Sequence, residues 1–120
     1  MYKINVDAQK NRLYLTLIGF FTPEEILRCG DETIAATRKL KAGYDVVTDI
    51  TEFKPGSAEV AKDIERVQAH FIKTGARQGV RVVGQNSSSS MQFDRVGKLA
   101  GYQSTPVRTM VEAETLLNAL

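Results

Sequence analysis

The sequence has little of the chemistry that usually builds metal centres or covalent cross-links. Its 120 residues include one cysteine, Cys29, and one histidine, His70. A single thiol cannot form an internal disulfide, and one thiol with one imidazole is too few for the common zinc ligand sets. We therefore expect no metal and no cofactor. Cys29 is interpreted as a small residue at a helix edge, and His70 as a helix-flank residue with one hydrogen bond.

Long apolar runs and an excess of one charge are also missing. No apolar segment approaches the roughly 20 residues that a bilayer-spanning helix needs, and the first residues have the pattern of a strand rather than of a signal peptide. The formal net charge is +2, which is too small to indicate nucleic-acid binding without clustered Lys and Arg. These absences favour a cytoplasmic protein that has no transmembrane segment and does not bind nucleic acid.

What is present fits one domain over residues 1–120. Hydrophobic residues make up 42% and charged residues 25%, as in ordinary soluble domains, and no repeat or linker interrupts the chain. Five short segments have the alternating or continuously apolar pattern of strands: residues 2–6, 13–18, 44–50, 80–83 and 105–110. The polar segment 7–11 is short, so the first two strands are expected to form an antiparallel hairpin. Pro106 indicates that the last strand lies at a sheet edge.

Apolar residues at helical spacing follow four of these strands. Thr22 and Glu25 have the spacing of a capping box before the first helix. Its expected apolar face runs to about Leu40 and comprises Ile26, Leu27, Gly30, Ile34 and Thr37. The second helix follows a break at Pro55 and Gly56, and its narrow apolar stripe comprises Val60, Ile64, Val67 and Phe71.

Two further pairs at capping-box spacing, Ser89 with Gln92 and Thr109 with Glu112, predict the third and fourth helices. The apolar face expected for the third comprises Met91, Phe93, Val96 and Ala100. The fourth is expected to carry Ala113, Leu116, Leu117 and Leu120. Of the two aromatic residues before the first helix, one is expected to be buried and the other to add to an exposed apolar patch; they are Phe20 and Phe21.

The element order β-β-α-β-α-β-α-β-α predicts an α/β fold. We expect a single-layer, mixed but mostly parallel, five-stranded sheet covered by helices, because each later crossover is long enough for parallel pairing. Open sheets of this kind usually bind ligands and partners where the carboxyl ends of strands meet helix N-termini. Residues 44–59 contain a strand end, a turn and a helix start, so they are the expected functional region.

Candidate site residues lie along this edge, in the serine-rich loop and on the second helix: Asp49, Thr51, Phe53, Ser57, Lys62, Arg66, Ser87 and Ser88. Two roles are open for Asp49, a ligand-binding or general-base carboxylate or, more commonly, an acceptor for N–H groups of the following turn. Ser57 is either a helix cap, the more common role, or a phosphorylation site. The loop with Ser87 and Ser88 is either an anion cradle or a solvated loop.

These segments resemble those of the STAS family, the anti-sigma factor antagonist fold, and within it the small bacterial STAS-like proteins related to the CRAL-TRIO lipid-binding fold. The resemblance spans nearly the whole chain, from the leading hairpin through the strands VVTDI and VRVVG to a late strand. In the antagonists, an apolar-apolar-Asp/Asn-Leu strand is followed by an aromatic residue and then by Asp-Ser at the next helix start. A partner kinase phosphorylates that serine.

The match is made residue by residue at the expected functional region. Val47 and Asp49 match the strand, Phe53 matches the aromatic residue, and Ser57 lies at the corresponding helix start. The chain departs from the pattern at Pro55-Gly56, which stands where Asp-Ser is expected.

The resemblance implies a non-enzymatic regulatory or protein-interaction module that docks a partner through residues 51–57 and the second helix, with Ser57 as a phosphosite. The alternative is a small apolar or acyl ligand in a pocket under the second helix, lined by Val60, Ile64, Phe71 and Phe93. No Ser-His-Asp or Cys-His pairing is evident, so an enzyme is not expected. Pairing of an exposed edge strand with a second copy, giving a homodimer, is also open.

Overall fold

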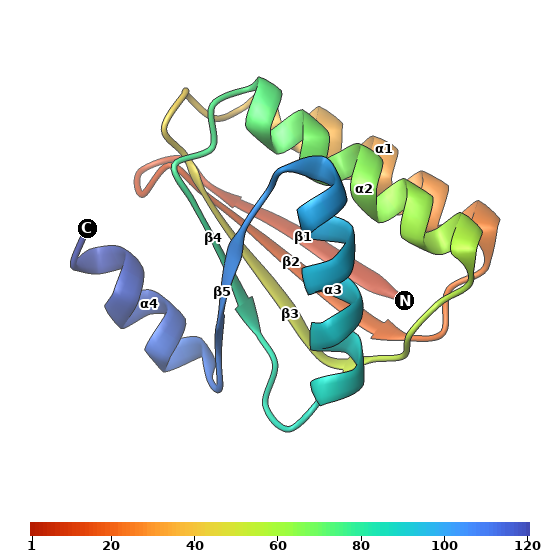
Figure 1. The fold of residues 1–120 in the computed structure, drawn as a ribbon. Coiled ribbons are helices and arrows are strands. Elements are labelled where there is room, and N and C mark those ends of the chain that lie inside the picture. The colour runs from red at the N-terminus through yellow and green to blue at the C-terminus, as the bar shows by residue number, and fades with distance from the viewer.

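The strands lie side by side in the order in which they follow one another along the chain (Figure 1). The computed structural model describes residues 1–120, and its five-stranded sheet has the order β1 (Tyr2–Asp7), β2 (Arg12–Gly19), β3 (Asp45–Phe53), β4 (Gln78–Val82) and β5 (Ser104–Val107). β1 is antiparallel to β2, and the other neighbouring pairs are parallel. The α/β class, the element order and the mixed, mostly parallel sheet are therefore confirmed.

Helices cover the two faces of the sheet unequally. One face carries α1 (Pro23–Thr37), α2 (Ala58–Lys73) and α3 (Ser87–Ala100), whereas α4 (Met110–Asn118) lies against the other (Figure 1). The edge strand β5 contains Pro106, as predicted. None of the four helices combines the length and the apolar content that a membrane span requires.

Strand alternation divides the apolar residues between the two faces of the sheet. On the side of α1, α2 and α3, Leu17 and Ile50 pack with three aromatic rings, those of Phe21, Phe53 and Phe93. The ring centroid of Phe53 lies 5.6 Å from that of Phe21 and 5.7 Å from that of Phe93. At this spacing aromatic pairs add to the stabilisation from burial alone. The main core therefore lies on the three-helix side.

The contact between α4 and the sheet combines a small apolar cluster with charged groups. Leu117 of α4 packs against valines of β3 and β4. Glu114 accepts three hydrogen bonds, from Arg12 Nη1 at 2.6 Å, the Tyr14 hydroxyl at 2.5 Å and Lys10 Nζ at 3.3 Å. The carboxylate of Glu114 therefore connects α4 to β2 and to the β1–β2 turn.

Three helices begin where their capping residues predict. The hydroxyl oxygens of Thr22, Ser57 and Thr109 each accept a hydrogen bond from the backbone N–H three residues on, at 3.1, 3.4 and 3.1 Å. The second hydrogen bond of the capping box, from the Thr22 N–H to the Glu25 carboxylate, is absent at α1. The Glu25 carboxylate instead pairs with the amino terminus of Met1 at 2.9 Å. The last strand ends earlier than predicted because Thr109 already caps α4.

The predicted cap of α3 is wrong. The helix begins at Ser87 and its cap is Asn86, whose Oδ1 accepts from the Ser89 N–H at 3.3 Å. Ser89 is fully buried, and its hydroxyl donates to the Phe53 carbonyl at 2.7 Å. Asparagine caps helices as well as serine does, so the local sequence permits either start, and the contact with β3 decides between them.

Three residues expected on the apolar faces of helices are exposed: Leu27 is 49%, Met91 68% and Leu120 61% accessible, and Leu120 lies beyond the end of α4. On α1 the buried face includes the predicted Gly30, together with Cys29 and Thr33, which were not predicted. α2 lies so close to α1 there that a Cβ on Gly30 would be 2.5 Å from Asp63 Oδ2. The packing partner decides which side of a helix is buried, and hydrophobic spacing alone does not report it.

Candidate functional site

The ends of β3 and β4 meet the starts of α2 and α3 at one edge of the sheet, as predicted (Figure 1). The Asn86 side-chain amide donates to the carbonyls of Ile50 and Phe53, both at 2.7 Å. The Gln92 side chain bonds both backbone groups of Gly56, donating to its carbonyl and accepting from its N–H, at 3.2 Å each. Asn86 and Gln92, at the start of α3, therefore hold the end of β3 and the following loop to Gly56 in place by hydrogen bonds.

The three candidate serines of this edge are exposed, and two of them, Ser57 and Ser88, line different recesses. Ser57 is the observed cap of α2, so its capping role is confirmed, while its phosphorylation stays a prediction. Ser87 and Ser88 are exposed in the first turn of α3. Ser88 lines an open recess of about 430 Å³ with residues 51–55, whereas Ser57 lines a separate groove between α2 and α3.

Asp49 and Thr51 hydrogen-bond to each other near the end of β3. Asp49 Oδ1 accepts from the Thr51 N–H at 3.0 Å and from the Thr51 hydroxyl at 2.8 Å. Of the two roles open for Asp49, the structural one is therefore observed. Val47 packs with residues of α4, so alternation places Asp49 on the α4 side of the sheet. Asp49 and Ser57 therefore do not share a site.

Phe53 does not lie on the surface of the candidate edge. It is only 2% exposed and packs between Phe21 and Phe93. A docked partner cannot touch it, so its assignment to a partner edge is corrected to a core position. The residues before α1 divide as predicted, because Phe21 is buried and Phe20 is 73% exposed.

The two basic candidates on α2, Lys62 and Arg66, differ in whether they already form ion pairs within the protein. Arg66 pairs through Nη2 with Asp31 at 3.1 Å and through Nε with Asp63 at 2.9 Å. These carboxylates, Asp63 first, hold the pKa of Arg66 above its usual value. Lys62 is exposed and takes part in none of the ion pairs. Lys62 is therefore available to a partner, whereas Arg66 already joins α2 to α1.

A groove that was not predicted from the sequence lies between α2 and α3. Its volume is about 280 Å³, and it is lined by Gly56, Ser57, Ala58, Ala61, Gln92, Arg95, Val96 and Leu99. Leu99, at its rim, is 73% exposed, and Met91 lies two helical turns away on the outer face of α3. Met91, Arg95 and Leu99 are spaced four residues apart, which places them on one face of α3. This spacing is the sequence feature from which the exposed face could have been predicted.

A second space lies inside the protein, between the sheet and the helices α1, α2 and α3. Its volume is about 50 Å³, and three of the predicted lining residues are present, Ile64, Phe71 and Phe93, but Val60 is not. A cavity of about 150 Å³ is needed to hold a benzene-sized apolar molecule. An acyl chain therefore does not fit the space as it stands.

Cys29 and His70 have structural surroundings. Cys29 is buried in the core rather than at a helix edge, and burial raises the pKa of its thiol to about 12, so the thiol stays protonated. His70 Nε2 lies 2.9 Å from Thr37 Oγ1, which is the single hydrogen bond predicted for it. Partial burial, followed by the positive charge of Lys73, lowers the pKa of His70. No three His, Cys, Asp or Glu side chains lie close enough together to hold a metal ion.

Comparison with known proteins identifies the fold. The chain is similar to an uncharacterized protein of the DUF3478 family with a SpoIIAA-like fold from Shewanella loihica PV-4, with a TM-score of 0.72 and 14% sequence identity. The match covers 97% of this chain and 93% of that one. No protein-family model and no curated protein matches the sequence. The chain therefore has a SpoIIAA-like, STAS-like fold, as the resemblance in the sequence predicts.

Proposed function

We propose that this protein is a non-enzymatic module that binds a protein partner through the surface formed by α2 and α3 next to Ser57. The α2–α3 docking surface comprises Ser57, Ala58, Ala61, Lys62, Met91, Arg95 and Leu99. The observation that carries the proposal is the groove of about 280 Å³ between the two helices, with Leu99 exposed at its rim. An apolar groove with an exposed apolar rim is typical of a site for an apolar side chain of a partner.

The charges beside the groove define the partner further. Arg95 lines the groove, is exposed and forms none of the ion pairs of the structure. Lys62 is also unpaired on the neighbouring surface of α2. A partner that presents an apolar side chain flanked by a carboxylate would fill the groove and neutralise Arg95. Such complementary charges mainly favour the rate and specificity of association.

The fold supports a regulatory role for this surface. This sequence resembles the anti-sigma factor antagonists. Those proteins use the same STAS-like architecture to dock their protein partners. The Asp49 carboxylate is engaged by Thr51, which supports a module without catalysis.

Ser57 provides a means of regulating the docking surface. Its hydroxyl is exposed at the start of α2 and lines the same groove as Arg95. A phosphate there would add close to two negative charges beside a helix N-terminus, where they are tolerated, and beside the cation that is proposed to meet the partner. Phosphorylation of Ser57 is therefore proposed to weaken binding of an acidic partner.

Site-specific photo-crosslinking in the native cells tests the proposal. A photoreactive phenylalanine analogue at Met91 or Ala58 is expected to capture one protein, identified by mass spectrometry. The same analogue at Val111 of α4, which is 74% exposed, is the matched control and is expected to capture nothing specific. Leu99→Glu is expected to weaken the association of the purified partners at least tenfold, because it places a charge in the apolar groove.

Two results would reject the docking surface. One is equal capture from Met91 and Val111, and the other is unchanged affinity of the purified partner for a folded Leu99→Glu variant. Capture of a second copy of this chain from Met91 would identify the partner as the protein itself and would establish the homodimer.

A further inference from the structure

The internal space under α2 contains polar groups that have no partner in the protein. Gln68 is 4% exposed, its side-chain amide makes no hydrogen bond, and its Oε1 is fully buried. Thr48 and Tyr102 line the same space, are half-buried, and have hydroxyls that make no hydrogen bond within the protein. Burial raises the pKa of Tyr102, so its hydroxyl keeps its proton and stays able to donate. A buried polar group without a partner is costly, and natural proteins usually satisfy it.

The sequence makes room for these groups at a specific position. A Cβ on Gly79 would lie 2.0 Å from the Tyr102 hydroxyl, so no other residue at this point of β4 leaves space for the phenol. Apolar side chains form much of the remaining lining and include Leu15, Leu17 and Phe93. The space is therefore a small chamber with apolar walls and a few hydrogen-bonding groups, the general composition of a ligand site.

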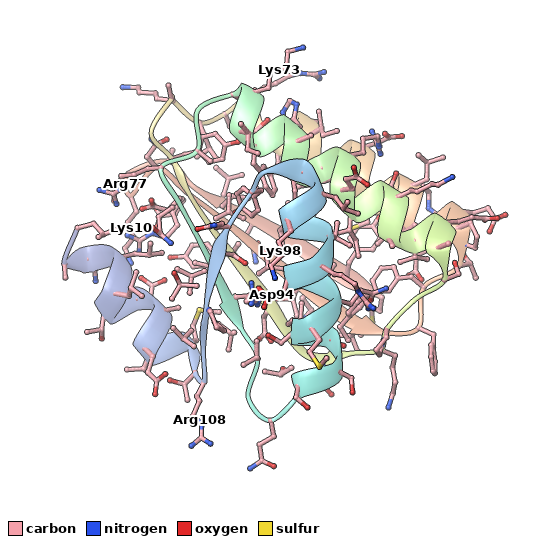
Figure 2. The ribbon with its side chains drawn as sticks, viewed as in Figure 1. Lys10, Lys73, Arg77, Asp94, Lys98 and Arg108 are labelled. Carbon is pink, nitrogen blue, oxygen red and sulfur yellow. The ribbon has the colours of Figure 1, made fainter.

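A polar recess between α3 and β5 leads toward this chamber. The recess has a volume of about 190 Å³ and shares four lining residues with the chamber: Arg81, Phe93, Tyr102 and Ser104. Figure 2 shows Asp94 and Lys98, which line the recess, on the side of α3 that faces β5. A molecule entering from the solvent would pass these charged residues before it reaches the chamber.

The charges around the chamber exclude a charged occupant. Arg81 is fully engaged: it donates to Ser90 and Ser104 and pairs with Asp94 at 2.7 Å. Asp63, the other ionised side chain that lines the chamber, pairs through Oδ1 with Arg66 at 2.9 Å, although its Oδ2 is buried without a hydrogen-bond partner. Each charge around the chamber therefore already has a partner of opposite sign, and burying an unbalanced charge is strongly unfavourable. The side-chain amide of Gln68, which has a donor and an acceptor and no partner in the protein, and the Tyr102 hydroxyl are the groups left to hydrogen-bond an uncharged occupant.

The volume limits the size of the occupant. A water molecule needs roughly 10 to 15 Å³ of a cavity measured in this way. A cavity that binds benzene provides roughly 25 Å³ for each non-hydrogen atom. A chamber of about 50 Å³ therefore accommodates roughly two to five non-hydrogen atoms. We propose that Gln68, Tyr102 and Thr48 form a binding site for a small uncharged molecule that carries both a hydrogen-bond donor and an acceptor, such as a primary amide or a short alcohol. This site is separate from the docking surface and does not depend on it.

Titration of the ¹⁵N-labelled protein with acetamide, followed by two-dimensional NMR, tests the site. Acetamide is expected to produce saturable shifts at the amides around Gln68 and Tyr102, with an affinity on the order of millimolar for a ligand of this size. Acetate has the same shape and carries a charge, so it is expected to bind at least tenfold more weakly. Gln68→Met keeps the length of the side chain and removes its amide, and it is expected to weaken acetamide binding at least tenfold.

Gln85→Met, in the exposed loop before α3, is the matched control and is expected to bind acetamide as the parent protein does. Tyr102→Phe removes one hydroxyl and serves as the second variant if Gln68→Met does not fold. Shifts that rise linearly without saturation, or equal binding by a folded Gln68→Met and by Gln85→Met, would overturn the proposal. In either case the chamber would hold water only.

Discussion

Ser57 contributes to the stability of the protein through one side-chain hydrogen bond, which a single substitution can remove. Its hydroxyl caps α2 by accepting from the Val60 N–H. Ser57→Ala is expected to lower the free energy of unfolding by about 1 kcal/mol, because that N–H loses its partner. Ser57→Asp is expected to keep most of the stability, since a carboxylate also caps and interacts favourably with the helix N-terminus. Urea denaturation measures both.

The matched control is Ser88→Ala in the first turn of α3. Ser88 is exposed and does not cap a helix, so this change is expected to alter the free energy of unfolding by less than about 0.5 kcal/mol. Equal losses for the alanine variants of Ser57 and Ser88 would show that the cap of α2 contributes nothing measurable.

Which residues could be predicted from the sequence depends on how far apart the contacting groups lie in the chain. The caps at Thr22, Ser57 and Thr109 involve partners three residues away, so their spacing alone predicted them. Gln68 and Tyr102 line the same chamber although 34 positions separate them in the sequence. No local sequence pattern connects two residues that far apart. The sequence therefore predicted the starts of three helices and an apolar pocket under α2, whose lining includes Ile64, Phe71 and Phe93 as expected, but it did not predict the polar groups of that pocket.

At the scale of elements, α4 depends on the protonation state of one carboxylate. Partial burial alone would raise the pKa of Glu114, but the hydrogen bonds from Tyr14 and Lys10 and the charge of Arg12 hold it below its usual value. A carboxylate with a lowered pKa in the folded state contributes stability above its unfolded pKa of about 4.3. That contribution is lost as the pH falls through the folded-state pKa.

Glu114→Gln is accordingly expected to lower the free energy of unfolding by about 1 kcal/mol at pH 7, since it removes hydrogen bonds to a charged group. The difference from the parent protein should shrink at pH 3, where the parent carboxylate becomes protonated. Denaturation at both pH values measures this. Glu52→Gln, at an exposed position of β3, is the control and should leave the stability unchanged at pH 7. A difference that does not depend on pH would contradict the role of the carboxylate.

The elements themselves were largely predictable, whereas their contact faces were not. The strand and helix order follows from hydrophobic spacing, which each segment carries within itself. The buried side of α1 is set by the close approach of α2 at Gly30, and so Leu27 was wrongly placed in the core. The burial of Phe53 likewise depends on α3, whose Phe93 ring packs against it.

For the whole molecule, the sheet should be most stable at its centre. β3 lies between two strands, has helices on both faces, and contains Val46, Val47 and Ile50, each at most 1% exposed. Its amide hydrogens are expected to exchange with solvent more slowly than the hydrogen-bonded amides of the edge strands β1 and β5. Hydrogen–deuterium exchange measured by NMR checks this order. Exchange of β1 as slow as that of β3 would indicate that β1 is covered, as in a dimer paired through this edge.

The order of the strands also has a consequence for how the protein is made. Each strand pairs with the one that precedes it in the chain, so no strand has to enter between two that are already paired. A chain emerging from the ribosome can extend its sheet by one strand at a time in the direction of synthesis. The β1–β2 hairpin closes a short loop and can form first, whereas the parallel pairs join segments separated by a whole helix and are expected to form more slowly. α4 can then cover the second face once β3 and β4 have paired.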